Sequence, residues 1–468
     1  MSALYRLRSR PNADPPPAVS GRGAVSSPGL AVTAARIRAR WRERLVASAL
    51  VNHLIGLGLM ARAMVRRHPV EARLTDLVVA CRRVSAPPLR RILARQLRPW
   101  SEGAGAQVWR QLQLGWTRYS RELETRKLTT SLLLKGPGPD GEKGVLYSSF
   151  EYNWLRLLAH HDARRFLADY FLVGASSWSP PDYGVMLSFA GVSRDPVFLG
   201  VSNAVDMAAY GIVGSAVRPL PLMACDWINP EFYAPKDRHA RDVDILMVAN
   251  FSPFKRHVLL FRALRRMRRD LRVALIGIRA PDRGEKELRA EARQLGAYQD
   301  LEILNNVPIE TVTDYQCRAK ISLILTLREG SCVAVTESMF ADTPVGMMRN
   351  AHIGGKAHIN PETGMLLSEA RLDRQLSRFL EASASYHPRE WALKHITCHH
   401  ASRMLNDTLR GYSREAGYPW TRDITPLCWR YVPSYVDPAD QDRIAPELER
   451  LRERYGIELE KFQYRPRP

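Results

Sequence analysis

Short apolar runs alternate with helical stretches through most of the chain after residue 128. The runs predict strands at 131–135, 144–149, 170–174 and 197–201, and then at 245–249, 272–277, 301–304, 321–326 and 344–348. Helical periodicity separates the later runs, at 257–269, 286–295, 309–320 and 333–341. Several runs are apolar on both faces, which is typical of parallel strands covered by helices. The pattern predicts an α/β protein with two Rossmann-like domains, at 129–240 and 241–385.

The segments that flank the two domains have a different pattern. Residues 1–30 are rich in Pro, Gly and Ser and are expected to form a disordered leader. Residues 31–128 predict a basic helical extension, and 386–468 predict a helical tail. The N-terminus lacks the order of regions found in a signal peptide, and the six cysteines form no CxxC pair. We therefore expect a cytoplasmic protein.

An uncharged stretch at 45–61 stands out within the extension. It has seventeen residues, with Asn52 and His53 near its middle, whereas a membrane span needs roughly 20 mainly apolar residues. Three interpretations stay open: a helix in the membrane surface, a helix packed on the protein's own core, and a true span.

Positive charge is concentrated in the same region. The chain has 69 Lys and Arg against 48 Asp and Glu, and residues 1–128 hold 24 of the basic and 7 of the acidic side chains, or +17 of the +21. Such an arm suits an anionic membrane surface, so peripheral association is expected. Arginines interleaved with tryptophans also suit nucleic acid, but no RNP-like, KH-like or zinc-finger pattern accompanies them, so nucleic acid is not the expected partner.

Three loops follow strands of the second domain, where a doubly wound sheet binds its ligand. The first contains Asn250, Lys255 and Arg256 and leads into a helix, so side-chain charge and backbone N–H groups can bind one anion together. The second runs from Arg328 to Val333, and Ser331 is a candidate cap for the helix that begins before Glu337. The third carries Gly354 and Gly355, which would let backbone approach a ligand closely.

Together these loops resemble the nucleotide-sugar site of GT-B glycosyltransferases, specifically retaining family 4 (glycosyl transferases group 1). Glu329 and Glu337 have the spacing of that family's Glu-x7-Glu motif. Pro253 and Lys255 match the family's Arg-x-x-Pro-x-Lys loop, and Gly354-Gly355 and residues 362–367 match its later Gly-Gly and Asn-Gly-Leu-Leu positions. Residues 219–232 resemble the stretch that ends the family's first domain. The resemblance covers roughly residues 197–385. The resemblance implies a GT-B fold, in which two Rossmann-like domains face a cleft and the first binds the acceptor.

The resemblance also implies roles for individual residues. Lys255 would bind the donor pyrophosphate, Glu329 would lie near the donor sugar and its anomeric centre, and Glu337 would accept hydrogen bonds from the ribose. The rest of the donor site would comprise Asn250, Arg256, Arg328, Gly330, Ser331, Cys332, Val333, Gly354 and Gly355. The expected reaction is metal-independent hexosyl transfer with retention from a nucleotide-diphosphate sugar, without a cofactor, to a cell-envelope lipid or polysaccharide intermediate.

Two features leave other interpretations open. Asn250 stands where the family has a phosphate-binding Arg, so the chain could instead be a non-catalytic binding protein with a GT-B shell. A further alternative is a nucleic-acid-binding protein that acts through the basic arm.

Histidines cluster at His160-His161 and at His395, His399 and His400 with Cys398. The second cluster lacks a ligand pair that would complete a tetrahedral set, so no metal site is predicted. His160 or His161 would contact the donor sugar if either matches a family histidine.

Overall fold

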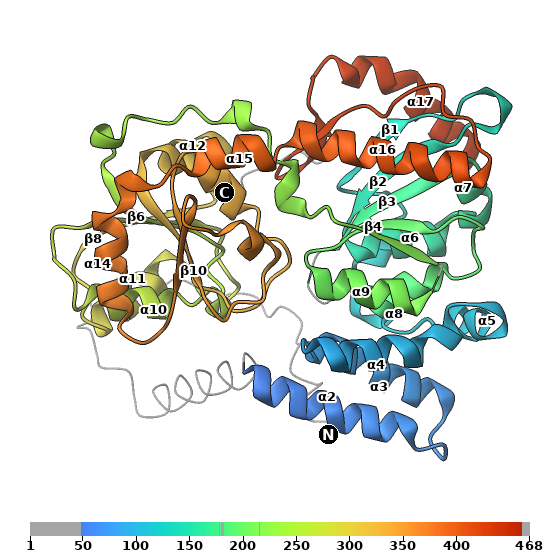
Figure 1. Cartoon of the computed structure of the whole chain (residues 1–468), viewed down its shortest axis with the longest axis horizontal. Coiled ribbons are helices and arrows are strands. Elements are labelled where there is room, and N and C mark those ends of the chain that lie inside the picture. The colour runs from blue at the N-terminus through green and yellow to red at the C-terminus, as the bar shows by residue number, and fades with distance from the viewer. Residues whose placement is uncertain (1–47, 177, 179–181, 215, 461–468) are drawn as a thin grey trace, which may run out of the picture. The chain divides into compact units, whose positions relative to one another are not determined.

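The computed structural model describes residues 48–176, 178, 182–214 and 216–460. The expected leader at 1–30 and the arginines between 36 and 44 lie outside these residues. Within them are two α/β domains, helices that precede the first domain, and a C-terminal segment (Figure 1). The α/β fold class predicted from the alternating pattern is confirmed.

The second domain is built on a six-stranded parallel sheet (Figure 1). Its strands lie in the order β8-β7-β6-β9-β10-β11, which is the 3-2-1-4-5-6 order of the Rossmann fold. The strands are β6 (Val243–Val248), β7 (Arg272–Gly277), β8 (Asp300–Asn305), β9 (Ala319–Ile324), β10 (Val345–Met348) and β11 (Gly364–Leu367). The helices between them are α10 (His257–Leu264), α11 (Glu285–Gln294), α12 (Ile309–Arg318) and α13 (Ala334–Phe340). The strand order reverses between β6 and β9, so the ligand crevice of this sheet is expected at their carboxyl ends.

The first domain has a five-stranded sheet in sequential order, β1 to β5. Its strands are β1 (Ser131–Lys135), β2 (Gly144–Ser149), β3 (Tyr170–Ala175), β4 (Val197–Gly200) and β5 (Val217–Leu220). β1 pairs antiparallel with β2, and the other pairs are parallel. The intervening helices are α6 (Glu151–His160), α7 (Ala163–Asp169), α8 (Tyr183–Met186) and α9 (Ala204–Val213). The predicted strands are confirmed, but β5 was not predicted because it is a short edge strand containing Pro219.

The helices before the first domain share its core. They are α2 (Ala49–Met64), α3 (Val70–Arg83), α4 (Pro87–Leu97) and α5 (Gly103–Leu112). Arg90 of α4 is buried, forms an ion pair with Asp206 of α9, and donates to Tyr183 Oη at 3.0 Å. A buried arginine requires such partners, so α4 is fixed to the domain and the extension is structurally part of it.

The polar residues of the uncharged stretch lie on the face of α2 that packs against the rest of the protein. Asn52 Oδ1 accepts from Arg83 at 3.0 Å, and His53 Nε2 accepts from the Ala86 N–H at 3.0 Å. Gly56 lets α3 approach, because a Cβ there would lie 2.3 Å from Val84 Cγ2. These contacts support the packed-helix interpretation for this face. No helix in the described part of the chain is long and apolar enough to cross a membrane.

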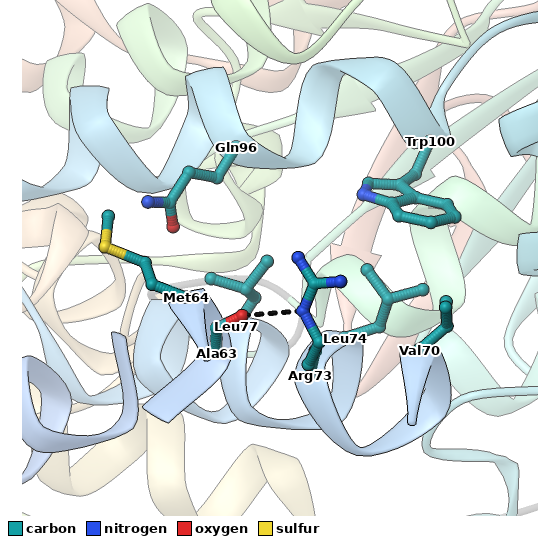
Figure 2. Close-up of a pocket in the computed structure, with 8 residues that line it drawn as sticks. All are labelled: Ala63, Met64, Val70, Arg73, Leu74, Leu77, Gln96 and Trp100. Atoms are coloured by element: carbon teal, nitrogen blue, oxygen red, sulfur yellow. Dashed lines mark hydrogen bonds between the residues drawn. The ribbon is translucent and has the colours of Figure 1, made fainter. Parts of the chain in front are cut away.

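A pocket of about 150 Å3 lies where α2 ends beside α3 and α4 (Figure 2). Arg73 Nε donates to the Ala63 carbonyl at 2.8 Å at its edge. The remaining lining is mostly apolar: Met64, Val70, Leu74, Leu77, Gln96 and Trp100.

The sequence pattern predicted a helical tail, but the C-terminal segment also contains two strands. Between α16 (Cys398–Ala416) and α17 (Asp440–Tyr455) lies a hairpin of β12 (Leu427–Arg430) and β13 (Val432–Tyr435). The segment returns to the first domain: Tyr412 and Tyr418 donate to Asp195 at 2.9 and 3.0 Å, and Tyr435 donates to the Leu133 carbonyl at 2.7 Å. The hairpin was missed because its strands are short and contain polar residues.

Candidate donor-binding site

Lys255 and Glu329 meet at the point where the strand order of the second sheet reverses. Lys255 follows β6 and Glu329 follows β9, and Lys255 Nζ forms an ion pair with Glu329 Oε1. Both side chains are largely buried. Glu329 Oε2 is buried and has no hydrogen-bond partner among the described residues, so one carboxylate oxygen remains available to accept a bond. The structure thus brings together Lys255 and Glu329, the two residues that the resemblance implied to be catalytic.

The other two polar residues of the first loop lie differently. Asn250 is exposed, and its Oδ1 accepts from the Ser252 N–H at 3.2 Å, which shapes the turn before Lys255. Arg256 has a positive φ of 65° and pairs with Glu369 in the loop after β11. Arg256 therefore carries charge beside Lys255 that is already partly neutralised.

Arg328 is directed toward the helices before the first domain. Its Nη2 donates to the Arg82 carbonyl in the last turn of α3. Burial, with Arg83 and Arg90 nearby, lowers the pKa of Arg328 to about 10. Arg328 therefore links the second loop to α3, a contact between distant parts of the sequence that local pattern does not reveal.

The second loop is fixed by contacts to its own chain. Ser331 Oγ accepts from the Ala224 N–H at 3.0 Å, whereas α13 begins after Val333 without a side-chain cap, so the prediction of Ser331 as its cap is wrong. Cys332 has a positive φ of 61°, and burial raises the pKa of its thiol well above the ordinary value. A non-glycine residue in this conformation is strained, and such strain is concentrated at binding sites. Gly330 and Val333 complete this loop.

The glycine pair of the third loop, predicted to let backbone approach a ligand closely, packs in this structure against the backbone of the second loop. The N–H groups of Gly354 and Gly355 donate to the carbonyls of Gly330 and Ser331 at 2.8 and 3.0 Å. A Cβ on Gly355 would lie 2.8 Å from Ser331 O, so the contact requires glycine. The two loops form one unit in this structure.

Glu337 lies on α13 and is buried. Gln316 Nε2 on α12 donates to Glu337 Oε2 at 3.1 Å. Burial raises the pKa of Glu337 above its ordinary value, and the Gln316 bond and Arg430 oppose that rise. Its hydrogen-bond contact is to Gln316, so Glu337 is not part of the Lys255–Glu329 pair.

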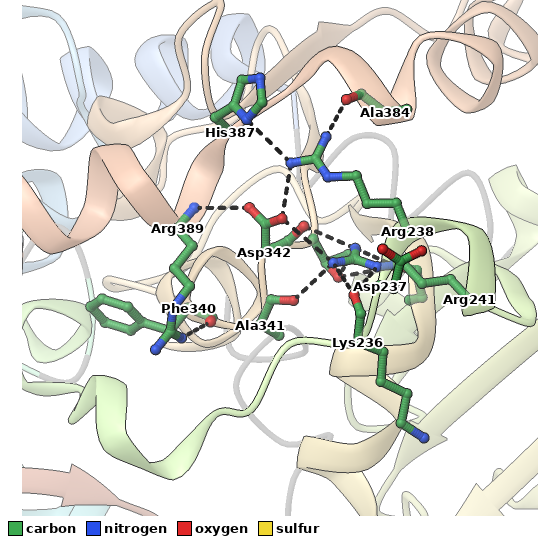
Figure 3. A network of polar contacts seen from close by, with 12 residues as sticks. Lys236, Asp237, Arg238, Arg241, Phe340, Ala341, Asp342, Ala384, His387 and Arg389 are labelled. Carbon is green, nitrogen blue, oxygen red and sulfur yellow. Dashed lines mark hydrogen bonds and ion pairs between the residues drawn. The ribbon is translucent and has the colours of Figure 1, made fainter.

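A polar network fixes the end of α13 to the connection between the domains (Figure 3). Asp342 accepts from Arg238 at 2.9 Å and from the Arg389 N–H at 3.4 Å. Arg241 is buried and donates to the Asp342 carbonyl at 2.9 Å and to Thr343 Oγ1 at 3.1 Å. Because α13 follows the second loop and carries Glu337, this network positions one side of the candidate site.

Two features near the site were missed from the sequence. His257, the first residue of α10, is fully buried, and neither ring nitrogen has a hydrogen-bond partner in the described chain. Burial beside Arg283 and Lys255 lowers the pKa of His257 to about 3. Its position directly after Lys255 and Arg256 could have drawn attention to His257, but the residue type alone does not show that the side chain is buried.

The second missed feature is a buried group of Cys225, Asp226 and His358. One potential metal-ligand atom from each lies within 4.8 Å of the other two. His358 Nε2 and Asp226 Oδ1 are 3.2 Å apart and satisfy one another, and Cys225 Sγ donates to Asp226 Oδ1 at 3.9 Å. The arrangement is that of a His–Asp contact linking residues 132 positions apart.

The histidines considered from the sequence have other partners. His160 and His161 share hydrogen bonds with the carbonyls of Leu123 and Arg126, at 2.8 and 3.0 Å. His395 stacks on Trp391. His160 and His161 thus bond to the segment that precedes β1, and His395 packs against a residue of its own helix, α15 (Pro388–His395).

Residues 231–381 match the family model of glycosyl transferases group 1. The match covers β6 to α14 (Leu372–Glu381) and therefore all three loops described above. The comparison with curated protein sequences finds no match.

The following solved structures are distant from this chain in sequence. Anabaena Alr3699/HepE in complex with UDP has 14% identity and a TM-score of 0.46, over 57% of this chain and 78% of that one. Sucrose-phosphate synthase from Thermosynechococcus elongatus has 14% identity and a TM-score of 0.45, over 58% and 74%. The pneumococcal O-GlcNAc transferase GtfA with UDP and GlcNAc has 12% identity and a TM-score of 0.42, over 55% of each chain. The family match over 231–381 and the two largely parallel sheets agree with the predicted two-domain, Rossmann-like GT-B fold.

Proposed function

We propose that this protein is a glycosyltransferase that transfers a hexosyl group from a nucleotide-diphosphate sugar to an acceptor. The observation that carries the proposal is the Lys255–Glu329 pair at the carboxyl ends of β6 and β9. A cation and a carboxylate at this position of a Rossmann sheet lie where such sheets bind nucleotides. The same residues lie in the segment that matches group 1 glycosyltransferases.

The chemistry assigned to the pair is electrostatic. When the donor binds, Lys255 moves from Glu329 to the pyrophosphate and stabilises the negative charge of the leaving group, with the amino end of α10 adding its dipole. Glu329 then accepts hydrogen bonds from the sugar hydroxyls, and its negative charge favours an oxocarbenium-like transition state. We propose transfer with retention, as in family 4.

A metal-independent reaction is part of the proposal. Lys255 and Arg256 supply fixed positive charge where a divalent ion would otherwise neutralise the diphosphate. Because Arg256 is paired with Glu369, donor binding must compete with that pair, and Lys255 is the main phosphate ligand. Turnover that persists in EDTA would support this assignment, and activity restored by manganese would contradict it.

The acceptor is proposed to be a cell-envelope lipid or polysaccharide intermediate, with the protein at the cytoplasmic membrane surface. The supporting observation is the positive charge of residues 1–128. An enzyme held at an anionic surface by such charge would meet a lipid-linked acceptor there.

Asn250 favours a second candidate, a binding protein that has lost catalysis. Where the family has arginine, the asparagine contacts Ser252 and adds no charge to the site. A screen of UDP-, GDP- and ADP-sugars by thermal shift, followed by a transfer or hydrolysis assay with the best ligand, separates the two. Stabilisation with turnover supports the enzyme, stabilisation without turnover supports the binding protein, and no stabilisation by any nucleotide-sugar contradicts both.

A further inference from the structure

The outward face of α2 carries a stripe of exposed apolar side chains. Leu50, Leu54 and Leu57 recur at helical spacing and are 70%, 60% and 42% exposed. Of the thirteen large apolar side chains exposed in the described residues, seven lie between 50 and 70: Leu50, Leu54, Ile55, Leu57, Met64, Val65 and Val70. Scattered exposed leucines need no explanation, but a concentration on one helix and its turn marks an interaction surface.

Positive charge adjoins this stripe. Arg66 and Arg67 are exposed in the turn between α2 and α3, and neither has an ion pair within the described chain. Between residues 62 and 73 there are four arginines and one acid, Glu71. The surface is therefore apolar along the helix and cationic at its end.

The pocket beside this turn adds a third element. Arg73 donates through Nε to the Ala63 carbonyl, and Figure 2 shows its remaining guanidinium nitrogens directed into the pocket, on the side of Gln96 and Trp100. Gln96 Oε1 is buried without a partner in the described residues, and as an acceptor it suits a hydroxyl of a headgroup, not the phosphate oxygens. An apolar pocket with guanidinium donors suits the anionic headgroup of a lipid with adjoining apolar atoms.

We propose that the outward face of α2 and the α2–α3 turn dock on an anionic lipid bilayer, with Arg66 and Arg67 at the phosphates and the Arg73 pocket receiving a headgroup. The exposed apolar stripe matches the acyl-chain boundary of a bilayer, and the unpaired cations beside it match the layer of anionic headgroups. The 16 residues of α2 span about 24 Å, short of the ~30 Å hydrocarbon core, so α2 lies in the surface. The proposal locates the membrane association suggested above and is independent of sugar transfer.

Co-sedimentation of the full-length protein with vesicles tests this surface. The vesicles contain phosphatidylcholine alone or with phosphatidylglycerol, at low and high salt. We expect binding to the anionic vesicles that high salt weakens only in part, because apolar burial is not screened. Leu54→Glu should weaken binding at least tenfold at both salt concentrations, whereas Leu393→Glu, an exposed leucine on α15 (Pro388–His395), should leave it unchanged.

The two arginines of the α2–α3 turn are tested with their own matched control. Arg66→Gln with Arg67→Gln should weaken anionic-vesicle binding about twenty-five-fold at low salt, about fivefold for each arginine. Arg266→Gln with Arg269→Gln changes two exposed arginines elsewhere and should have no effect. Arg73→Gln should reduce the preference for anionic over neutral vesicles.

Other occupants of the face give different results. If residues 1–47 or a second copy of the chain cover it, the wild type will not bind either vesicle, and in the second case Leu54→Glu will lower the mass in solution; both outcomes overturn the proposal. Equal binding by Leu54→Glu and wild type overturns it as well. Thermal shifts with nucleotide-sugars should be the same for all these variants, so a failed donor site is distinguished from a failed membrane surface.

Discussion

Lys255 Nζ donates to Glu329 Oε1 across the two loops at which the strand order of the second sheet reverses. The residues are 74 positions apart, and their side chains are 11% and 17% exposed. Partial burial strengthens their attraction and keeps both charges near the place where a nucleotide would bind. The pair is therefore both a contact of the ligand-free protein and the centre of the proposed donor site.

Replacing Lys255 should weaken donor binding strongly. We expect Lys255→Ala to raise the dissociation constant of the preferred nucleotide-sugar about ten- to hundredfold, because a charge-assisted hydrogen bond contributes ~1.5 to 3 kcal/mol. Isothermal titration calorimetry measures this change. Lys286→Ala removes an exposed lysine from α11 and is the matched control. Equal affinity of the two variants would show that Lys255 is not a donor ligand.

Glu337→Gln should separate stability from binding. Burial raises the pKa of Glu337, so the protonated form is favoured in the folded state, and stability is lost as pH rises through that raised pKa. The glutamine variant should therefore melt at a higher temperature than wild type at pH 8, with the difference vanishing at pH 4. It should also bind the donor more weakly, because glutamine is a poorer acceptor for ribose hydroxyls. An identical difference in melting temperature at both pH values would contradict the titration argument.

His257 predicts an opposite dependence on pH. Folding lowers its pKa from the ordinary value near 6.5 to about 3. Between these two pH values His257 is protonated in the unfolded chain but not in the folded protein. Stability is thus lost as pH falls, by about 2 kcal/mol at pH 5. His257→Phe should reduce the loss of unfolding free energy between pH 7.5 and pH 5, measured by urea denaturation. A variant that keeps the full acid sensitivity would show that His257 does not cause it.

Arg90 tests whether the helices before the first domain belong to its core. Arg90→Ala leaves Asp206 without its buried cation, and breaking such a pair costs about 3 to 5 kcal/mol. Arg91→Ala changes the exposed neighbour and should cost less than about 0.5 kcal/mol. Urea unfolding of both variants gives the comparison. Similar small losses would mean that α4 is only loosely attached.

Much of the fold was predictable because local pattern and global position agreed. Runs such as Ile245–Val248 are apolar on both faces, which identifies central parallel strands directly. β5, with Pro219, and β11, which is half-buried, carry weaker patterns and were missed as strands. The hairpin β12–β13 and the return of the C-terminal segment to Leu133 depend on contacts between distant residues, which periodicity does not encode.

The site shows the same division. Lys255 and Glu329 could be placed together because the carboxyl ends of parallel strands share one edge of the sheet. The partner of Ser331, the Ala224 N–H, and the partner of Arg328, the Arg82 carbonyl, come from other parts of the chain. Their contacts arise from domain packing, so the sequence indicated the residues of the loops but not what those side chains bind in the ligand-free protein.

A thermal-shift titration with nucleotide-sugars tests whether the donor binds at the Lys255–Glu329 pair. At 100 times its dissociation constant the preferred donor should stabilise the wild type by roughly 2.7 kcal/mol. At the same concentration Lys255→Ala, which binds about ten- to hundredfold more weakly, should be stabilised by only about 0.4 to 1.4 kcal/mol. Glu329→Ala should also show a reduced shift, whereas Lys286→Ala should match the wild type. A full shift in both site variants would contradict a donor site at this pair.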